Sequence, residues 1–163
     1  MALPYDYIAG LTDGEGCFSL RCHSEVKRQR KGQPAYLRWR AEFAIVMRAD
    51  DEPLLGLVQE TIGCGTITKS RGTVRYSVQG IGDLHDIILP FFLKHTMYGK
   101  KRKDFELWGK AVKILWRHNS NLVNIRSGTK GFTDNPWGAD ELAELRSIHQ
   151  EIMGVKTNQL VVG

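Results

Sequence analysis

Two carboxylates, Asp13 and Glu15, lie beside Gly14 and Gly16 at the end of a short apolar stretch, residues 7–12, whose composition predicts a helix. The last turn of a helix carries partial negative charge from its unpaired carbonyls, so acids are unfavourable there unless a cation or a backbone N–H group compensates them. Carboxylate oxygens are ligands that Mg²⁺ prefers. The spacing therefore predicts a metal site, or else solvated acids beside a glycine-rich helix end.

The same stretch contains small residues that cover little surface and allow a second backbone to approach closely. Glycine is a poor helix former, so these residues also lower the stability of the helix. We expect two such helices to pack face to face, although the same residues could pack against the chain's own core. The predicted contact consists of Ala9, Gly10, Asp13 and Gly14.

The segment from Ile8 to Gly16 resembles the motif that names the LAGLIDADG homing endonucleases, and the rest of the chain is similar to that family almost throughout. The resemblance implies an α+β fold of order αββαββα, with an antiparallel DNA-binding sheet and extra C-terminal helices. It places Glu15 at the position of the catalytic, metal-binding acid, with Mg²⁺ as the cofactor and Mn²⁺ as a substitute. The Gly14 carbonyl is a further candidate ligand. Asp13 is a second catalytic candidate, ranked below Glu15, because it matches the family's other acid, which looks more like a helix-end and interface residue than a direct ligand.

The number of motifs bears on assembly, because in the resembling family two motif helices each deliver one acid to one DNA strand. We find one copy of the motif in this chain and therefore expect a homodimer with a long, partly palindromic double-stranded DNA target. The expected activity is hydrolysis of both strands with short 3′ overhangs, in intron or intein mobility. The expected location is inside a prokaryotic cell, in its cytoplasm or nucleoid, or in an organelle.

The family also places a lysine just before its later long helix, and the segment 100–105 looks like that region. Lys101 fits the spacing best and Lys100 is the neighbouring choice. Such a lysine could stabilise charge on the reacting phosphate, or it could simply contact backbone phosphate from the surface. One departure concerns Met47, which stands where some members carry a glutamine that organises water. Methionine cannot do this.

The 163 residues are enough for one domain, which we divide into a core of about residues 5–117 and a helical extension of about 118–163. The three cysteines, Cys17, Cys22 and Cys64, have neither zinc-site spacing nor the even count of a disulfide framework, so we expect them to be reduced. No apolar run reaches membrane-spanning length. We therefore expect neither a membrane partner nor a small-molecule substrate.

Charge and hydrophobic periodicity together predict a nucleic-acid interface. The net charge of +5 is unevenly distributed, since residues 21–40 hold seven cations and one acid. Polar and apolar residues alternate in four segments, which predicts strands with one buried face. These strands are expected over 17–23, 36–47, 66–70 and 73–79, and helices over 51–61, 82–93, 103–116 and 139–153.

The exposed strand faces offer side chains that recognise base edges, because Arg pairs with guanine, Gln with adenine and Glu with cytosine. The strands 66–70 and 73–79 are joined by Arg71-Gly72 and are expected to form a hairpin. Cations in the loop after the first strand, and in this hairpin, would contact phosphates. The alternative is an ordinary sheet with one solvated face. The predicted DNA-binding residues are Arg21, His23, Lys27, Arg28, Arg30, Lys31, Arg38, Arg40, Glu42, Thr66, Thr68, Lys69, Arg71, Arg75 and Gln79.

Two other functions compete with the nuclease. The same fold could serve as a non-cleaving DNA-binding regulator or as an intron RNA maturase, and Met47 favours that alternative. A general RNA-binding protein would explain the positive charge, but not a small-residue helix that ends in Gly-Glu-Gly. The retained acids favour catalysis.

Overall fold

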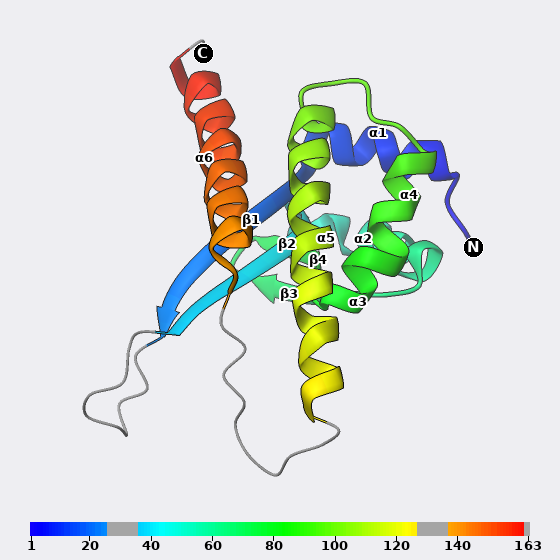
Figure 1. Cartoon of the computed structure of the whole chain (residues 1–163). Coiled ribbons are helices and arrows are strands. Elements are labelled where there is room, and N and C mark those ends of the chain that lie inside the picture. The colour runs from blue at the N-terminus through cyan, green and yellow to red at the C-terminus, as the bar shows by residue number, and fades with distance from the viewer. Residues whose placement is uncertain (26–35, 127–136, 162–163) are drawn as a thin grey trace.

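A computed structural model describes residues 1–25, 36–126 and 137–161. Helix, strand, strand and helix follow one another twice along the chain, and two long helices complete it (Figure 1). The elements are α1 (Tyr5–Glu15), β1 (Gly16–Glu25), β2 (Tyr36–Arg48), η1 (Ala49–Asp51), α2 (Glu52–Ile62), β3 (Thr66–Ser70), β4 (Thr73–Val78), α3 (Ile81–Asp83), η2 (Leu84–Ile88), α4 (Leu89–Lys94), α5 (Lys101–Arg126) and α6 (Ala139–Val161). The predicted α+β class and element order are confirmed.

The four strands form one antiparallel sheet of order β1-β2-β4-β3. The β1–β2 pairing begins at Gly16 opposite Ile45, next to the end of α1. The β3–β4 hairpin turns at residues 71–72, where Gly72 has a φ of +75° that suits glycine. In Figure 1, helix α5 passes in front of the strands, with α1 near its upper end and α4 to its right. The opposite face of the sheet carries the polar side chains of the strands.

The core lies between the sheet and the helices α4 and α5. The ring of Phe18 stacks on Phe43 with centroids 5.2 Å apart and meets the rings of Phe92 and Trp108 at 5.5 and 5.0 Å. All four side chains are buried. Packing of rings from β1, β2, α4 and α5 therefore holds the start of β1, and with it the end of α1, against the helical layer.

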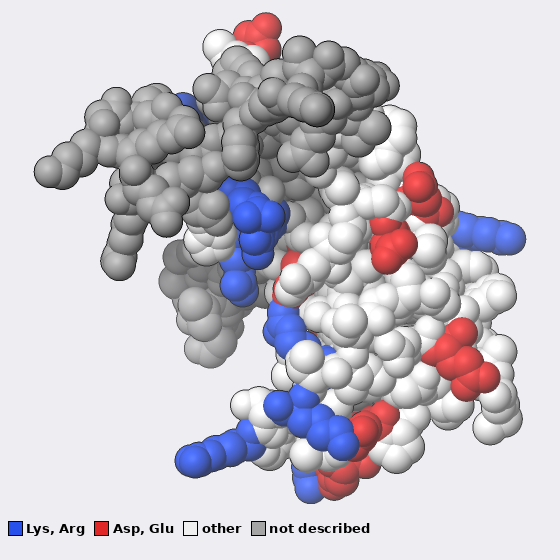
Figure 2. Space-filling model, turned by 90° about the horizontal axis from the view of Figure 1, so that it is seen from below, with Lys and Arg blue, Asp and Glu red and all other residues white. Residues whose placement is uncertain are grey.

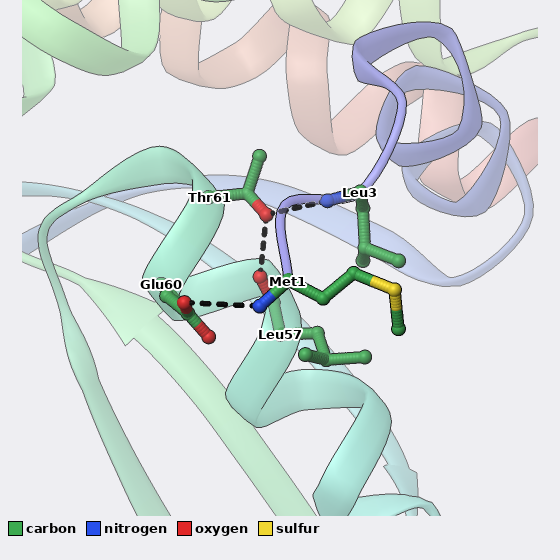
Figure 3. Close-up of polar contacts among 5 residues, drawn as sticks. All are labelled: Met1, Leu3, Leu57, Glu60 and Thr61. Atoms are coloured by element: carbon green, nitrogen blue, oxygen red, sulfur yellow. Dashed lines mark hydrogen bonds and ion pairs between the residues drawn. The ribbon is translucent and has the colours of Figure 1, made fainter.

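The beginning of α1 is tied to α2 by the N-terminal residues (Figure 3). The Leu3 N–H donates to Thr61 Oγ1 at 2.9 Å, and the Thr61 hydroxyl donates to the Leu57 carbonyl at 2.7 Å. The amino group of Met1 lies 3.3 Å from Glu60 Oε1. Because α1 is anchored at this end, its C-terminal residues have a defined position in the fold.

Helix α6 docks on α5 and on the outer end of β1 and β2. The rings of His118 and Trp137 stack with centroids 3.5 Å apart, and His149 meets Trp39 edge-on at 6.0 Å. Glu141 Oε2 lies 3.8 Å from His118 Nδ1. The apolar side of α6 is buried through Leu145, Ile148 and Ile152. The C-terminal helix therefore extends the core rather than standing apart from it.

Several helix boundaries differ from those predicted. Residues 81–94 form one helical stretch that contains a π-helical turn, Leu84–Ile88, just before Pro90; such a wide turn accommodates a residue without an N–H donor. Helix α5 continues ten residues beyond Trp116, because no Gly or Pro interrupts it there. The boundary expected after residue 117 thus falls inside α5. Helix α6 likewise continues past Met153.

Two further features concern the cysteines and the length of the helices. Cys17, Cys22 and Cys64 form no disulfide, and Cys22 is exposed. Partial desolvation raises the pKa of the Cys22 and Cys64 thiols. Over residues 1–25, 36–126 and 137–161, no helix combines the length and apolar character needed to span a bilayer.

Candidate active site and polar sheet face

Helix α1 has a buried side and an uncovered side. Ile8, Ala9 and Thr12 are buried, whereas Gly10 and Gly14 are exposed, as the 3.6-residue repeat of a helix requires. Ala9 was expected at the contact between two helices, but it is only 3% exposed and faces the chain's own core. The surface left for a second helix is therefore the side that contains the two exposed glycines.

The glycines of α1 differ in what their own chain requires of them. A Cβ atom at Gly16 would lie 2.5 Å from Thr12 Cγ2, where α1 turns into β1, so a side chain there would clash. A Cβ atom at Gly10 or Gly14 would meet no heavy atom of the rest of the fold within 4 Å. Packing within this chain therefore explains why position 16 is a glycine, but it does not explain the glycines at positions 10 and 14.

The Asp13 carboxylate is held by the backbone of a segment far away in the sequence. Its Oδ2 atom accepts hydrogen bonds from the N–H groups of Tyr98 at 3.0 Å and of Gly99 at 2.7 Å. Its Oδ1 atom is buried and has no hydrogen-bond partner. An acid at a helix C-terminus can be stabilised by a cation or by backbone N–H groups. Asp13 is stabilised by backbone N–H groups.

Glu15 has a different environment, although it is only two residues away. It is the last residue of α1, directly before β1, and its side chain is exposed. No hydrogen bond or ion pair of Glu15 occurs within the described part of the chain. Its carboxylate is therefore available to a ligand from outside the chain.

The two candidate lysines lie at the start of α5. Lys100 is exposed, and Lys101 is half-buried and begins the helix. They follow a connecting segment, residues 95–100, which is anchored in the core by Met97, 2% exposed, and bound to α1 through Asp13. This contact brings the lysine-bearing segment to the same helix end that carries Glu15.

The described residues of one chain do not by themselves form a complete metal site. Among the residues that the structure describes, no group of three or more His, Cys, Asp or Glu side chains is placed to hold a metal ion. The oxygens available near the helix end belong to Asp13, Gly14 and Glu15. Any cation bound there would need further oxygen ligands from water or from a bound molecule.

The sheet brings the predicted base-contacting side chains onto one face. The register pairs Arg21 with Arg40 and His23 with Arg38 across β1 and β2, and Thr68 with Arg75 across β3 and β4. Side chains on the alternate pleat, such as Trp39, Ala41 and Phe43, are buried in the core. We call the exposed surface of the sheet the polar sheet face. The predicted DNA-binding residues that the structure describes on it are Arg21, His23, Arg38, Arg40, Glu42, Thr66, Thr68, Arg75 and Gln79.

The polar sheet face has an ordered inner part and an open outer part. Glu42 accepts hydrogen bonds from Arg75 and Gln79, which links β2 to β4. Arg21 and Arg40 are exposed and form no hydrogen bond or ion pair with other residues in the described ranges. The inner cluster is therefore preorganised, whereas the outer arginines are free to meet a ligand.

The cations of the hairpin differ in position. Lys69 lies on the core-side pleat opposite Val74, and its Nζ is 2.7 Å from Glu52 Oε2. Strand residues alternate between faces, so Lys69 does not lie on the polar sheet face. This placement does not favour the phosphate contact that the sequence predicted for Lys69. Arg71 is exposed in the turn. The other predicted phosphate contacts, Lys27, Arg28, Arg30 and Lys31, lie outside the described residues.

Figure 2 shows how the charged side chains are distributed on the face seen from below. Lys and Arg gather mostly on the left of this view, and most Asp and Glu side chains lie to the right. The two kinds of charge meet at the lower edge. This face of the molecule is therefore electrostatically asymmetric, as the charge segregation in the sequence predicted.

Sequence reasoning did not identify Gly99. A Cβ atom at this position would lie 2.5 Å from Asp13 Oδ1. The available signal was a glycine directly before a lysine-rich helix start, but nothing local connects it to a residue 86 positions away. Met47 differs from Gly99, because its position was considered from the sequence. It pairs with Val74 across β2 and β4, and its half-buried side chain packs against the core. The side chain therefore faces away from the polar sheet face.

Fold and site together define an α+β protein in which an unpaired carboxylate at a helix end adjoins a sheet with a cationic face. The sequence profile described as LAGLIDADG endonuclease matches residues 8–112, which include α1, the whole sheet and the first half of α5. The chain belongs to the LAGLIDADG homing endonuclease family.

Curated relatives carry names that agree with this family. "Probable intron-encoded endonuclease 3" of Neurospora crassa is 32% identical over 112 residues, which are 66% of this chain and 20% of the relative. "Probable intron-encoded DNA endonuclease 1" of Mycosarcoma maydis is 32% identical over 103 residues, 63% of this chain and 34% of the relative. The chain thus spans between one fifth and about one third of the length of these two relatives.

Solved structures share the fold. I-SmaMI bound to an uncleaved DNA target in the presence of calcium ions superposes with a TM-score of 0.73 at 24% identity, over 92% of this chain and 45% of that chain. The homing endonuclease I-TnaI superposes with a TM-score of 0.70 at 22% identity, over 97% of this chain and 99% of that chain. The fold therefore corresponds to about half of one neighbour and nearly all of the other.

Proposed function

We propose that the protein is a Mg²⁺-dependent DNA endonuclease that acts as a homodimer on a long, partly palindromic duplex. It hydrolyses both strands, leaves short 3′ overhangs and serves intron or intein mobility. The observation that carries the proposal is the unpaired Glu15 carboxylate where α1 meets the polar sheet face. An exposed acid without a partner at a helix C-terminus is unfavourable unless a cation binds it.

The polar sheet face supports duplex DNA as the substrate. A two-stranded ribbon can enter the major groove, where arginine makes bidentate contacts to guanine. Arg21 and Arg40, opposite each other on β1 and β2, have no competing partner within the described residues. The DNA-bound neighbour I-SmaMI has the same fold. The exposed cations supply affinity for phosphate, and the mixed polar side chains supply sequence preference.

The uncovered side of α1 supports a homodimer. Gly10 and Gly14 have space around them, and the nearby Tyr7 is 47% exposed. Two copies of α1 that pack through these glycines would form a two-fold seam. Each copy would then place its Glu15 near one strand. The match of this chain to about half of I-SmaMI agrees with such an arrangement.

The donor set fits a hard divalent cation. Glu15 would hold the ion, with the Gly14 carbonyl as a further ligand, and phosphate and water would supply the remaining oxygens. When bound there, Mg²⁺ or Mn²⁺ would supply Lewis acidity toward the scissile phosphate and toward the attacking water. Lys100 or Lys101 would orient that water or stabilise negative charge on the phosphate.

The decisive experiment compares the wild type with Glu15→Gln on a randomised, partly palindromic DNA library in Mg²⁺, followed by sequencing of the ends. The amide keeps the size of the side chain but loses the charge, so cleavage should disappear while DNA binding remains. Glu144→Gln, an exposed acid on α6, is the matched control and should cleave normally. Unchanged cleavage by Glu15→Gln would overturn the assignment.

A second candidate is a regulator or RNA maturase with the same fold. Met47 favours it, because an apolar side chain packed on the core cannot organise water for hydrolysis. Tight binding without breaks, combined with stronger binding to a structured intron RNA than to duplex DNA, would move the assignment to the maturase. Binding without breaks that prefers duplex DNA would indicate the regulator.

A further inference from the structure

We infer that Asp13 is a positioning residue that locks the segment 95–100 to the end of α1, and that Gly99 is its required partner. The lock places Lys100 and Lys101 beside the helix end that carries Glu15. The inference rests on the proposed role of those lysines and deepens it. It assigns a separate task to the second acid of the motif and names a residue, Gly99, that the sequence did not single out.

The first support is the geometry of the hydrogen bonds. One oxygen of Asp13 accepts two consecutive backbone N–H groups, those of Tyr98 and Gly99, at 3.0 and 2.7 Å. Hydrogen bonds to an ionised acceptor are stronger than those between neutral groups. Two donors that converge on one atom also fix the direction of the segment, which a single contact would not do.

The second support is electrostatic. At the end of α1, the Asp13 carboxylate lies near partial negative charge, which is unfavourable. The segment it binds leads directly into α5, a helix of 26 residues whose N-terminus carries partial positive charge. The carboxylate is therefore stabilised by holding the start of α5 against the end of α1. Release of the segment would remove that compensation.

The third support is the close approach at Gly99. A Cβ atom there would lie 2.5 Å from Asp13 Oδ1 and 3.0 Å from Asp13 Cγ. The φ angle of Gly99 is not positive, so its backbone conformation does not itself require glycine. Its carbonyl also accepts the Arg102 N–H at 3.2 Å, in the first turn of α5. Gly99 thus joins the carboxylate directly to the helix start, and a side chain at this position would have to displace the Asp13 carboxylate.

The lock is separable from the fold. Met97, 2% exposed, anchors the same segment in the core, and Phe105 and Trp108 hold α5 against the sheet. These contacts do not involve Asp13. Loss of the lock should therefore displace the lysines while leaving the core and the polar sheet face intact. The backbone of Tyr98, a residue that is 91% exposed, would also lose its fixed position.

The test uses three variants of the full chain: Asp13→Ala, Asp13→Asn and Gly99→Ala. The amide oxygen of Asp13→Asn can still accept both N–H groups, whereas Asp13→Ala removes the acceptor and Gly99→Ala pushes the carboxylate away. Gly82→Ala is the matched control, because that glycine is exposed and its Cβ would meet nothing within 4 Å. The measurements are the single-turnover cleavage rate in Mg²⁺, DNA affinity in Ca²⁺, and amide hydrogen exchange at Tyr98 and Gly99.

We expect Asp13→Ala and Gly99→Ala to lower the single-turnover rate about a hundredfold, the usual effect of a misplacement of about 1 Å. DNA affinity should stay within about twofold, since the polar sheet face is unchanged. Asp13→Asn should recover most of the lost rate and most of the amide protection. Combining Gly99→Ala with Lys101→Ala or Lys100→Ala should cost less than the product of the single losses, because the lysine is already displaced.

The outcomes separate this inference from the proposed function. If Glu15→Gln abolishes cleavage but Gly99→Ala cleaves at the wild-type rate, the lock is wrong and the nuclease stands. If Asp13→Asn is as inactive as Asp13→Ala while keeping its amide protection, Asp13 is a metal ligand and the positioning role is overturned. Amide exchange at Tyr98 and Gly99 tests the lock in the protein alone. Unchanged protection in Asp13→Ala would refute it whether or not the protein cleaves DNA.

Discussion

The end of α1 and the outer part of the polar sheet face are built in opposite ways. At the helix end, directed hydrogen bonds hold Asp13, a steric requirement explains Gly16, and burial fixes Met97. On the outer sheet, Arg21 and Arg40 extend into solvent without a partner in the described part of the chain. Chemistry on one phosphate needs groups placed to within a fraction of an ångström. Recognition of many base pairs instead needs long side chains that can adjust.

The cluster of Glu42, Arg75 and Gln79 combines features of both regions. Glu42 holds Arg75 and Gln79 by hydrogen bonds, so this part of the sheet is preorganised although it belongs to the recognition surface. The difference suggests that rigidity decreases along the sheet from the inner β2–β4 pair toward the outer end of β1 and β2. Variants at each end should therefore affect different steps: the rate of cleavage at the helix end, and affinity or specificity on the sheet.

The largest effect, after that of Glu15→Gln, should come from the lysines. Lys100 and Lys101 are alternative candidates for one role, so we expect one of the two alanine variants to be impaired. That variant should lower the single-turnover rate by about 10² to 10³, as expected for loss of a group that stabilises transition-state charge. DNA affinity should change little. Lys103→Ala is the control and should cleave normally, because Lys103 is an exposed lysine in the same first turn of α5. Wild-type rates in both lysine variants would remove them from the mechanism.

The next effect concerns base recognition. Arg40→Ala should reduce discrimination at one position of each half-site by about 1 to 3 kcal/mol, the contribution of a bidentate arginine–guanine contact. Competition binding against single-base variants of the target measures this change. Arg117→Ala, an exposed arginine on α5, should leave discrimination unaltered. If Arg40→Ala weakens binding equally to all sequences, its contact is to phosphate.

The hairpin offers a smaller and purely electrostatic comparison. Arg71→Ala should reduce the slope of log affinity against log salt concentration by about 1.8, because the homodimer loses two phosphate contacts and each contributes about 0.9. Lys69→Ala should not change the slope, because Lys69 lies on the opposite pleat beside Glu52. Affinity titrations at several salt concentrations test both variants. Equal slopes for the two variants would contradict the placement.

The smallest effect involves α6 and stability rather than DNA. Burial lowers the pKa of His118 below its ordinary 6.5, and Glu141 offsets this only in part. The unfolded chain therefore takes up a proton first as the pH falls, so stability decreases below about pH 6.5 until the folded-state pKa is passed. Urea unfolding at pH 7.5 and 5.5 should show a larger loss in the wild type than in His118→Phe, which keeps an aromatic ring against Trp137. Equal losses would rule out His118 as the cause.

Local patterns were sufficient for most of the fold. Alternation along β2 predicted which side chains are buried, and the Arg71-Gly72 dipeptide predicted the hairpin, because both depend on neighbours in sequence. The end of α5 was misplaced, since Asn119 and Ser120 are weak helix formers. In the folded chain, α6 packs along α5, and such packing overrides weak propensity.

The sequence by itself determined the types of the active groups: two acids among glycines, lysines before a helix, and cations on alternating strands. Only the tertiary structure decided their tasks. It directs Asp13 to the amides of Tyr98 and Gly99, 85 and 86 residues away, and leaves Glu15 unpaired. The reason is physical. Side-chain periodicity is a property of one element, whereas a hydrogen bond between distant segments depends on how the buried rings of the sheet and α5 pack together.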